Sequence, residues 1–385
     1  MIVSRIILAN WRNFRQVDVN LGERMFVVGP NASGKSNFLD AFRFLRDVAR
    51  HGLQEAVSSR GGLSKIRCLA ARRHPDVEID VTLAEPDSPA PSWRYALGIR
   101  QEVRGYRHPA LVYERVWRGE EQIVDRPNDE DQRDELRLTQ TYLEQVNANA
   151  QFREIAGFLR STLYLHLIPQ LLRYPEAFAN ASMPDDPFGR SFLERVARTP
   201  EKTKRSRLRR IEQALRLAVP QLKQLAEVKD ERGAPHLEAI YEHWRPHGAK
   251  QREDQFSDGT LRLIGLLWSL LESDSLLLLE EPELSLNAAI VRKLPAIIYR
   301  LQRQKKRQVI ISTHSFDLLS DKGIGGEEAL LLTPEPDGTR IDTASRLEDV
   351  RLLLEGGNTL ADAILERTAP EGIEKFGQLK LGLDE

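Results

Sequence analysis

The sequence predicts an α/β fold with mixed sheets and a helical insertion, built on a parallel core that carries helices on both faces. Apolar strands alternate with helices at both ends of the 385-residue chain, and this alternation is typical of parallel sheets joined by crossover helices. A glycine-rich loop, Gly29–Ser36, lies between a predicted strand and a predicted helix. Between the two ends, Asp185–Lys223 has a helical pattern and is strongly basic.

The N-terminal part is predicted to run strand, strand, glycine loop, helix. The helix covers Ser36–Val48, because its apolar residues recur with the spacing of one helical face. Runs of β-branched and aliphatic residues predict the strands. These strands are 2–8, 17–21 and 25–28, followed by 77–83, 93–99, 111–117 and 122–124 as an antiparallel sheet that flanks the first unit.

The rest of the chain alternates in the same way. Helical patterns cover 129–159, 185–223, 261–271 and 288–303. Strand patterns cover 163–168, 237–244, 276–279, 309–312 and 329–332.

Composition excludes several classes of protein. Hydrophobic residues make up 41% and charged residues 29%, with a net charge of −1, so bulk disorder is excluded. Cys68 is the only cysteine, which excludes a disulfide framework and a cysteine zinc site within one chain. The N-terminus lacks the apolar core of a secretory signal, and the longest apolar runs are about half of a membrane span. We therefore expect a soluble cytoplasmic protein without membrane contact.

The loop Gly29–Ser36 (GPNASGKS) fits the phosphate-binding pattern G-x-x-x-x-G-K-[ST] in its strand-to-helix context. Main-chain N–H groups of such a loop surround a β-phosphate at a helix N-terminus. Lys35 is expected to bridge β- and γ-phosphates, and the Ser36 hydroxyl to bind magnesium. A plain glycine turn would not need the lysine or the serine. The predicted nucleotide contacts are Gly29, Asn31, Ala32, Ser33, Gly34, Lys35, Ser36 and Asn37.

An apolar strand ends in two acids, Glu280 and Glu281. Downstream of a phosphate-binding loop, the first acid is expected to hold magnesium through its water shell. The second is expected to orient and deprotonate the attacking water. The alternative is a strand that ends in surface charge.

Two further motifs flank this acidic strand. Ser257-Asp258-Gly259-Thr260 precedes the apolar helix, where serine and glycine form a phosphate-binding nest or a simple helix cap. His314 follows the next buried strand, from which a histidine could reach a γ-phosphate or serve only a structural role.

The order of these motifs resembles the ABC-type ATPase heads of the RecF/SMC/OLD-like group. The opening Ile6–Arg15 (IILANWRNFR) is similar to that group's first strand and NFR turn. The resemblance covers roughly residues 1–50 and 250–320. It implies a Mg²⁺-dependent ATP hydrolase in which two protomers sandwich two ATP molecules.

The resemblance also assigns roles to residues. Ser257 and Gly259 would contact the γ-phosphate held by the partner protomer, Glu281 would be the catalytic base, and His314 the switch histidine. Gln170, after a strand and a proline, would lie near magnesium with Ser36 and Glu280. Glu280 stands where aspartate is more frequent, and Ser285–Ala288 where leucine-histidine-proline is more usual.

The same resemblance predicts the domains: an ATPase lobe over 1–170, a helical arm over 171–250 and a second ATPase lobe over 251–385. The arm stands where SMC proteins carry their coiled coil, but it is too short and lacks sustained heptads. Its basic stretch Arg195–Arg216, with Arg205, Arg207, Arg209 and Arg210, either binds DNA phosphates or forms a solvated or partner-binding face.

For function, the chain resembles ATPases that act with a separate TOPRIM-like nuclease effector in bacterial anti-phage defence or DNA maintenance. We expect it to lack a nuclease domain of its own. The first alternative is a RecF-like repair ATPase that binds DNA directly. A nucleotide-binding subunit of a transporter is disfavoured by the NFR turn and by the basic arm.

Overall fold

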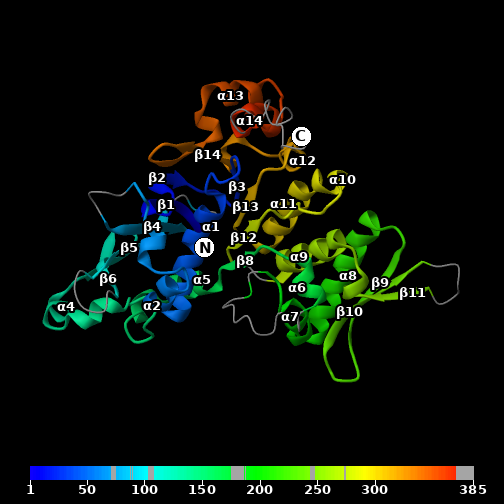
Figure 1. Ribbon diagram of the computed structural model, residues 1–385, viewed down its shortest axis with the longest axis horizontal. Coiled ribbons are helices and arrows are strands. Elements are labelled where there is room, and N and C mark those ends of the chain that lie inside the picture. Colours follow the sequence, from blue (N-terminus) through cyan, green and yellow to red (C-terminus); the bar gives the residue numbers. More distant parts are fainter. Residues whose placement is uncertain are drawn as a thin grey trace, which may run out of the picture. The chain divides into compact units, whose positions relative to one another are not determined.

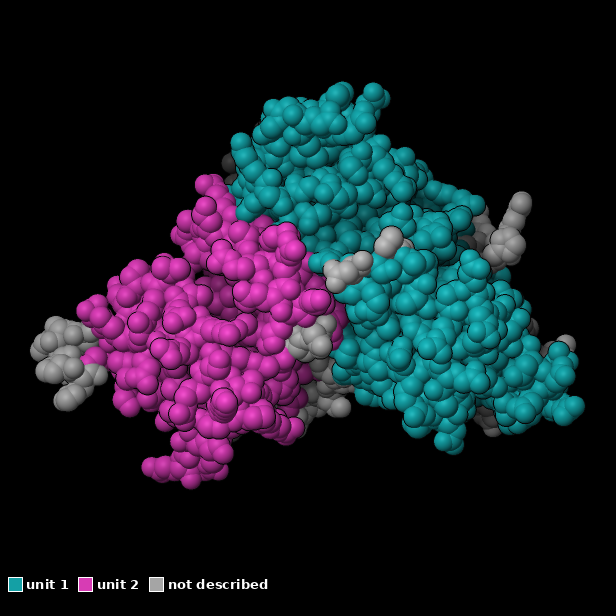
Figure 2. All heavy atoms as spheres, turned by 180° about the vertical axis from the view of Figure 1, so that it is seen from behind, with its two compact units in different colours: residues 1–162, 312–385 teal, residues 163–311 magenta. Residues whose placement is uncertain are grey.

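The computed structural model describes residues 1–70, 75–86, 88, 90–102, 108–174, 186, 188–242, 248–272 and 275–369. Contacts divide the chain into two compact units (Figure 2). Unit 1 comprises residues 1–162 and 312–385, and unit 2 comprises residues 163–311. The predicted division into two ATPase lobes and an arm concerns function and stays a prediction.

Unit 1 contains a six-stranded antiparallel sheet with the order β2-β1-β4-β5-β6-β7 (Figure 1). Its strands are β1 (Ile2–Trp11), β2 (Phe14–Asn20), β4 (Val77–Ala84), β5 (Pro91–Gln101), β6 (Pro109–Arg118) and β7 (Glu121–Arg126). Buried and partly exposed residues alternate along β4, as expected where one face packs on a core. The predicted antiparallel sheet is confirmed, and the first two predicted strands belong to it.

Unit 1 also contains the strand that leads into the glycine loop. β3 (Arg24–Val28) is buried throughout and pairs in parallel with β14 (Ala329–Glu335), which pairs antiparallel with β15 (Gly338–Thr343). α1 (Lys35–His51) follows the loop, as predicted, and one of its faces is aromatic and buried. On this face the ring centroid of Phe44 lies 5.2 Å from that of Trp11. The remaining helices of unit 1 are α2 (Leu53–Ser58), α3 (Leu63–Ile66), α4 (Asp129–Arg133), α5 (Arg153–Ser161), α12 (Phe316–Leu319), α13 (Glu348–Glu355) and α14 (Leu360–Thr368).

Unit 2 is built around the apolar helix α9 (Asp258–Glu272), which is buried on nearly every side from Thr260 to Leu271. β12 (Leu277–Glu280) pairs in parallel with β8 (Leu163–Leu165). β13 (Val309–Thr313) is buried throughout and leads from unit 2 into unit 1. The other helices are α6 (Pro169–Arg173), α7 (Phe192–Arg198), α8 (Glu201–Ala218), α10 (Ala288–Val291) and α11 (Leu294–Lys305).

The middle region combines helices with a small sheet. After α7 and α8 come β9 (Leu222–Lys229), β10 (Pro235–Tyr241) and β11 (Ala249–Arg252), an antiparallel sheet in the order β11-β10-β9. The sequence predicted helices here and a single strand, now β10. Leu222 and Leu225 of β9 are three residues apart, a spacing that is compatible with a helix, and pairing with β10 decides the outcome.

The predicted helix over 185–223 breaks between α7 and α8, and two further predicted helices are interrupted. The pattern over 129–159 resolves into α4, 3₁₀ turns at Glu135–Thr139 and Ala150–Phe152, and α5. α4 ends before Asp134, whose carboxylate accepts a hydrogen bond from the Leu136 amide and begins the first 3₁₀ turn. The pattern over 288–303 breaks between α10 and α11, where Pro295 lies in the first turn of α11. In the part of the chain that the structure describes, every helix is too short or too polar to span a bilayer.

A buried charge cluster fixes α1. The Asp40 carboxylate accepts hydrogen bonds from Arg60 at 2.9–3.1 Å and from Arg12 at 2.9 Å. Burial alone would raise the pKa of Asp40, but the charge of Arg60, with those of Arg43 and Arg12, outweighs it and lowers the pKa below its usual value. Asp40 is therefore ionised in the folded protein at neutral pH.

Asp40→Asn is expected to lower the free energy of unfolding at pH 7 by about 3 kcal/mol, because it removes the carboxylate shared by Arg12 and Arg60 and leaves Arg60 with Asp47 alone. An aspartate titrates near pH 3.9 in an unfolded chain, so Asp40 stabilises the fold above about pH 4. This contribution is lost as the pH falls through the lower folded pKa. Urea unfolding measured from pH 7 to pH 2 checks this. The free energy of unfolding should fall less steeply with pH in Asp40→Asn than in the wild-type protein.

The matched control is Asp18→Asn, which breaks the exposed ion pair with Arg5, both side chains being 47% exposed. We expect it to change stability by less than about 1 kcal/mol. Equal effects of the two substitutions would contradict the special role of the buried cluster.

Candidate functional site

The loop Gly29–Ser36, hereafter the P-loop, connects the buried end of β3 to the N-terminus of α1. Ala32 has φ 63° and Gly34 has φ 98°, so the chain turns twice through the left-handed region before the helix begins. No side chain caps α1 by hydrogen bonding, and its first turn has no acidic residue. The positive end of the helix dipole is therefore not neutralised locally, which favours an anion there.

Both glycines of the P-loop are required by close packing. A Cβ on Gly29 would lie 2.7 Å from Ser33 Oγ and 2.8 Å from the Leu332 carbonyl oxygen. A Cβ on Gly34 would lie 2.1 Å from Asn13 Nδ2. The loop is thus a close-packed backbone cradle of the kind that phosphate groups occupy.

Lys35 is 8% exposed, and its ammonium folds back over the cradle. Nζ donates to the main-chain oxygens of Gly29 at 2.9 Å and Pro30 at 3.0 Å. A buried ammonium at the start of a helix fits the charge of nucleotide phosphates. The predicted contacts Asn31, Ala32 and Ser36 are exposed, Ser33 is buried, and Gly34 and Asn37 are half-buried.

The acid pair lies in unit 2, at the end of β12. Leu277, Leu278 and Leu279 are fully buried, and Glu280 and Glu281 are half-buried. The Tyr164 hydroxyl of β8 donates to the Glu280 carboxylate. Glu281 has φ 44°, a left-handed conformation that costs a non-glycine residue about 1–2 kcal/mol. The backbone of this acid is therefore strained, as is common at functional sites.

The signature segment, Ser257–Thr260, forms the N-terminus of α9. The Ser257 hydroxyl lies 2.8 Å from Thr260 Oγ1 and accepts a hydrogen bond from the Thr260 amide at 3.2 Å, so Ser257 caps the helix. A Cβ on Gly259 would lie 2.6 Å from the Ser285 carbonyl oxygen. Unit 2 therefore brings the signature segment against the turn that follows the acid pair.

Gln170, the predicted magnesium ligand, lies in α6 and is exposed. Its amide donates to the Asp258 carboxylate at 3.4 Å, and Arg173 of the same helix forms an ion pair with Asp258 at 2.6 Å. Gln170 thus contacts the signature segment, and its role at magnesium stays a prediction.

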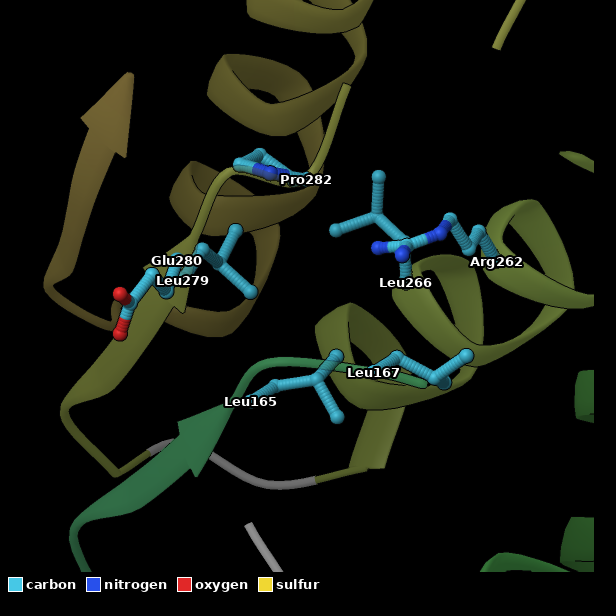
Figure 3. Close-up of a pocket in the computed structure, with 7 residues that line it drawn as sticks. All are labelled: Leu165, Leu167, Arg262, Leu266, Leu279, Glu280 and Pro282. Carbon is cyan, nitrogen blue, oxygen red and sulfur yellow. The ribbon is translucent and has the colours of Figure 1, made fainter. Parts of the chain in front are cut away.

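Arg262, one turn into α9, was not singled out from the sequence. It lines a pocket with room for about one water molecule, together with Leu165, Leu167, Leu266, Leu279, Glu280 and Pro282 (Figure 3). Figure 3 shows the guanidinium beside Leu266, with the Glu280 carboxylate directed away from it. Burial lowers the pKa of Arg262, and the charges of Asp258, Glu281 and Glu283 oppose that shift. A single cation in an otherwise apolar helix is the signal that could have identified it.

His314 follows β13 and is exposed. The next residue, Ser315, caps α12 through a hydrogen bond from the Leu318 amide at 3.3 Å. The predicted site residues are therefore distributed over the two units. Unit 1 carries the P-loop and His314, and unit 2 carries the acid pair, the signature segment and Gln170.

Comparison with known proteins identifies the family and the fold of the chain. A family model described as "AAA domain, putative AbiEii toxin, Type IV TA system" matches residues 24–321. The chain is also 47% identical over 47 residues to Endonuclease GajA of Bacillus cereus (strain VD045). That match covers 12% of this chain and 8% of the endonuclease, so it spans a small part of that protein.

Two solved structures share the fold. One is the Smc head domain of Pyrococcus furiosus with an extended coiled coil, bound to the C-terminal domain of ScpA, and the other is the Smc head domain of Pyrococcus yayanosii with a coiled coil and joint. Each is 13% identical to this chain, with a TM-score of 0.50, and each match covers 92% of this chain and 99% of the other. The predicted α/β P-loop fold is confirmed by these structures, and the chain belongs to the AAA domain family named above.

Proposed function

We propose that this chain binds ATP with Mg²⁺ and hydrolyses it. The observation that carries the proposal is the P-loop itself: a close-packed cradle at an uncapped helix N-terminus, with the buried ammonium of Lys35 across it. These features fit the triphosphate of a nucleotide, since they supply main-chain N–H groups, a helix dipole and a cation together.

Each predicted site residue then has a chemical task. Lys35 exchanges its loop carbonyls for phosphate oxygens and neutralises their charge. Ser36 and Glu280 would hold the magnesium ion, which adds positive charge at the phosphates when bound. Glu281 accepts a proton from the attacking water, and its left-handed backbone sets the direction of the carboxylate.

We further propose that two chains close on two nucleotides. Ser257 and Gly259 of one protomer would complete the site of its partner, and His314 would contact the γ-phosphate. The resemblance to ABC-type heads supports the two-chain site, and the helix cap formed by Ser257 at the N-terminus of α9 supports a phosphate contact there. The direct test of the proposed hydrolysis, as distinct from the closure of two chains, is ATP turnover by the purified protein, which should require magnesium and stop when EDTA is added.

The proposed consequence of this cycle is control of a partner effector, a TOPRIM-like nuclease, in anti-phage defence or DNA maintenance. The resemblance to the RecF/SMC/OLD-like group supports it, as does the short match to an endonuclease. Co-purification of such a partner in the presence of ATP, and not of ADP, would test it.

Direct DNA binding is a second candidate, and the surface of α8 favours it in part. Arg209 and Arg210 are exposed. Arg207 has a different role from the one considered above, because it donates to the Glu272 carbonyl oxygen at 2.8 Å and lies over the Trp268 ring. Arg205 pairs with Glu201 at 3.2 Å. The DNA surface would therefore centre on Arg209 and Arg210.

Charge reversal of Arg209 and Arg210 to glutamate is expected to weaken binding of duplex DNA at least tenfold at low salt, with near-normal ATP hydrolysis. Loss of two phosphate contacts should make the dependence of log affinity on log salt concentration shallower, with a slope smaller in magnitude by about 2. Arg115→Glu with Arg133→Glu, an equal charge change on exposed residues of unit 1, serves as the control. Unchanged DNA affinity would make this face a docking or solvated surface.

A further inference from the structure

Asn13 lies in the two-residue turn between β1 and β2, where Arg12 has φ 52°. Its side chain contacts the P-loop directly. Nδ2 donates to the Ser33 carbonyl oxygen at 2.9 Å, and Oδ1 accepts from the side-chain amide of Asn37 at 2.7 Å. The same carboxamide fills the space that a Cβ on Gly34 would need. Asn13 therefore contacts the chain on both sides of Lys35, in the P-loop and in the first turn of α1.

Asn13 also contacts the hairpin formed by β14 and β15. Nδ2 donates to Thr339 Oγ1 at 2.7 Å, and the Asn13 carbonyl oxygen accepts from the Thr339 amide at 2.8 Å. Gly338 allows this approach, because a Cβ there would lie 2.8 Å from the Asn13 carbonyl oxygen. One side chain thus joins the β1–β2 turn, the P-loop, α1 and a hairpin more than 300 residues away in sequence.

We infer that Asn13 is a positioning residue that holds the P-loop in its phosphate-binding shape and links it to the β14–β15 hairpin. The inference rests on the proposed nucleotide site and adds to it a residue and a connected element. Both donors and the acceptor oxygen of the carboxamide have partners, so the group is fixed in one orientation.

The P-loop needs such a support. Ala32 and Gly34 have left-handed backbones, and neither has a side chain able to hydrogen-bond and fix the turn. The hydrogen bond to the Ser33 carbonyl oxygen lies between these two residues, and the bond from Asn37 fixes the first turn of α1. A loop held before binding loses less conformational entropy when the nucleotide arrives. Removal of Asn13 should therefore weaken binding more than it slows turnover.

The test compares Asn13→Ala with the wild-type protein in the presence of Mg²⁺. Calorimetric titration with a non-hydrolysable ATP analogue should show about tenfold weaker binding, since two side-chain hydrogen bonds to the P-loop and α1 are lost. KM for ATP should rise by a similar factor, with kcat within about threefold of the wild-type value. Hydrogen exchange of the amides of Ser33–Asn37 should accelerate in the nucleotide-free variant.

A second pair of variants tests the link to the hairpin without touching the P-loop. Thr339→Val removes the hydroxyl that accepts a hydrogen bond from Asn13. It should weaken binding of the ATP analogue, by a smaller factor than Asn13→Ala does. Thr339→Ser retains the hydroxyl and should restore affinity. Asn128→Ala removes an asparagine that caps α4, so it controls for general destabilisation and should leave nucleotide affinity unchanged.

The outcomes separate this inference from the proposed function. If the wild-type protein binds the analogue and both Asn13→Ala and Thr339→Val bind it equally well, the inference is wrong and the nucleotide site stands. If Asn128→Ala weakens binding as much as Asn13→Ala, the effect is only one of stability and the inference fails. If the wild-type protein binds no nucleotide, the proposed function and the inference both fail.

Discussion

Replacing Lys35 by alanine is expected to abolish ATP binding while the fold remains intact. The ammonium is held at the mouth of the P-loop by the carbonyl oxygens of Gly29 and Pro30, so it is in place before a nucleotide arrives. Two charge-assisted contacts to phosphate contribute about 3–4 kcal/mol, and their loss corresponds to at least about a hundredfold in affinity. Alanine has a high helix propensity, so the start of α1 should persist.

Calorimetric titration with ATP and Mg²⁺ measures this effect, and circular dichroism checks the fold. Lys65→Ala is the matched control, because it removes an exposed lysine from α3 in the same unit and should bind ATP normally. Normal affinity of Lys35→Ala would place the nucleotide elsewhere and overturn the P-loop assignment.

The strands and the P-loop could be predicted from the sequence because their signals are local. β3 and β12 are short apolar runs, and the glycine spacing specifies a close-packed turn wherever it occurs between a strand and a helix. The capping interpretation of Ser257 was also available from its position before an apolar helix, and the structure contains that cap.

What could not be predicted depends on contacts between distant segments. β9 becomes a strand because β10 pairs with it, although its own residues have weak strand propensity. Arg207 looks like its exposed neighbours in sequence, yet the packing of α8 places it over Trp268 of α9. The contact between Asn13 and Thr339 joins the β1–β2 turn to the β14–β15 hairpin, more than 300 residues away in sequence. No periodicity or spacing rule reports such a pair.

Glu281 is the residue on which the proposed hydrolysis depends most. It stands directly after β12, where its backbone adopts a left-handed conformation with φ 44°. The Glu280 carboxylate accepts a hydrogen bond from the Tyr164 hydroxyl. We propose that Glu281 is the base that accepts the proton of the attacking water. Glutamine has the same length and shape as glutamate but cannot accept that proton, so Glu281→Gln separates chemistry from binding.

Glu281→Gln is expected to lower kcat for ATP hydrolysis by at least about a hundredfold, the usual contribution of a general base, with ATP affinity within about threefold of the wild-type value. The trapped ATP should also hold two protomers together, so light scattering should show a dimer with ATP and a monomer without it. Asp254→Asn, which changes an exposed acid in the same unit, should leave kcat and the oligomeric state as in the wild-type protein.

Hydrolysis by Glu281→Gln at the wild-type rate would mean that the base lies elsewhere. If Glu281→Gln loses hydrolysis but stays monomeric with ATP, Glu281 remains the base and the two-chain site is contradicted, because the proposed contacts of Ser257 require a partner protomer.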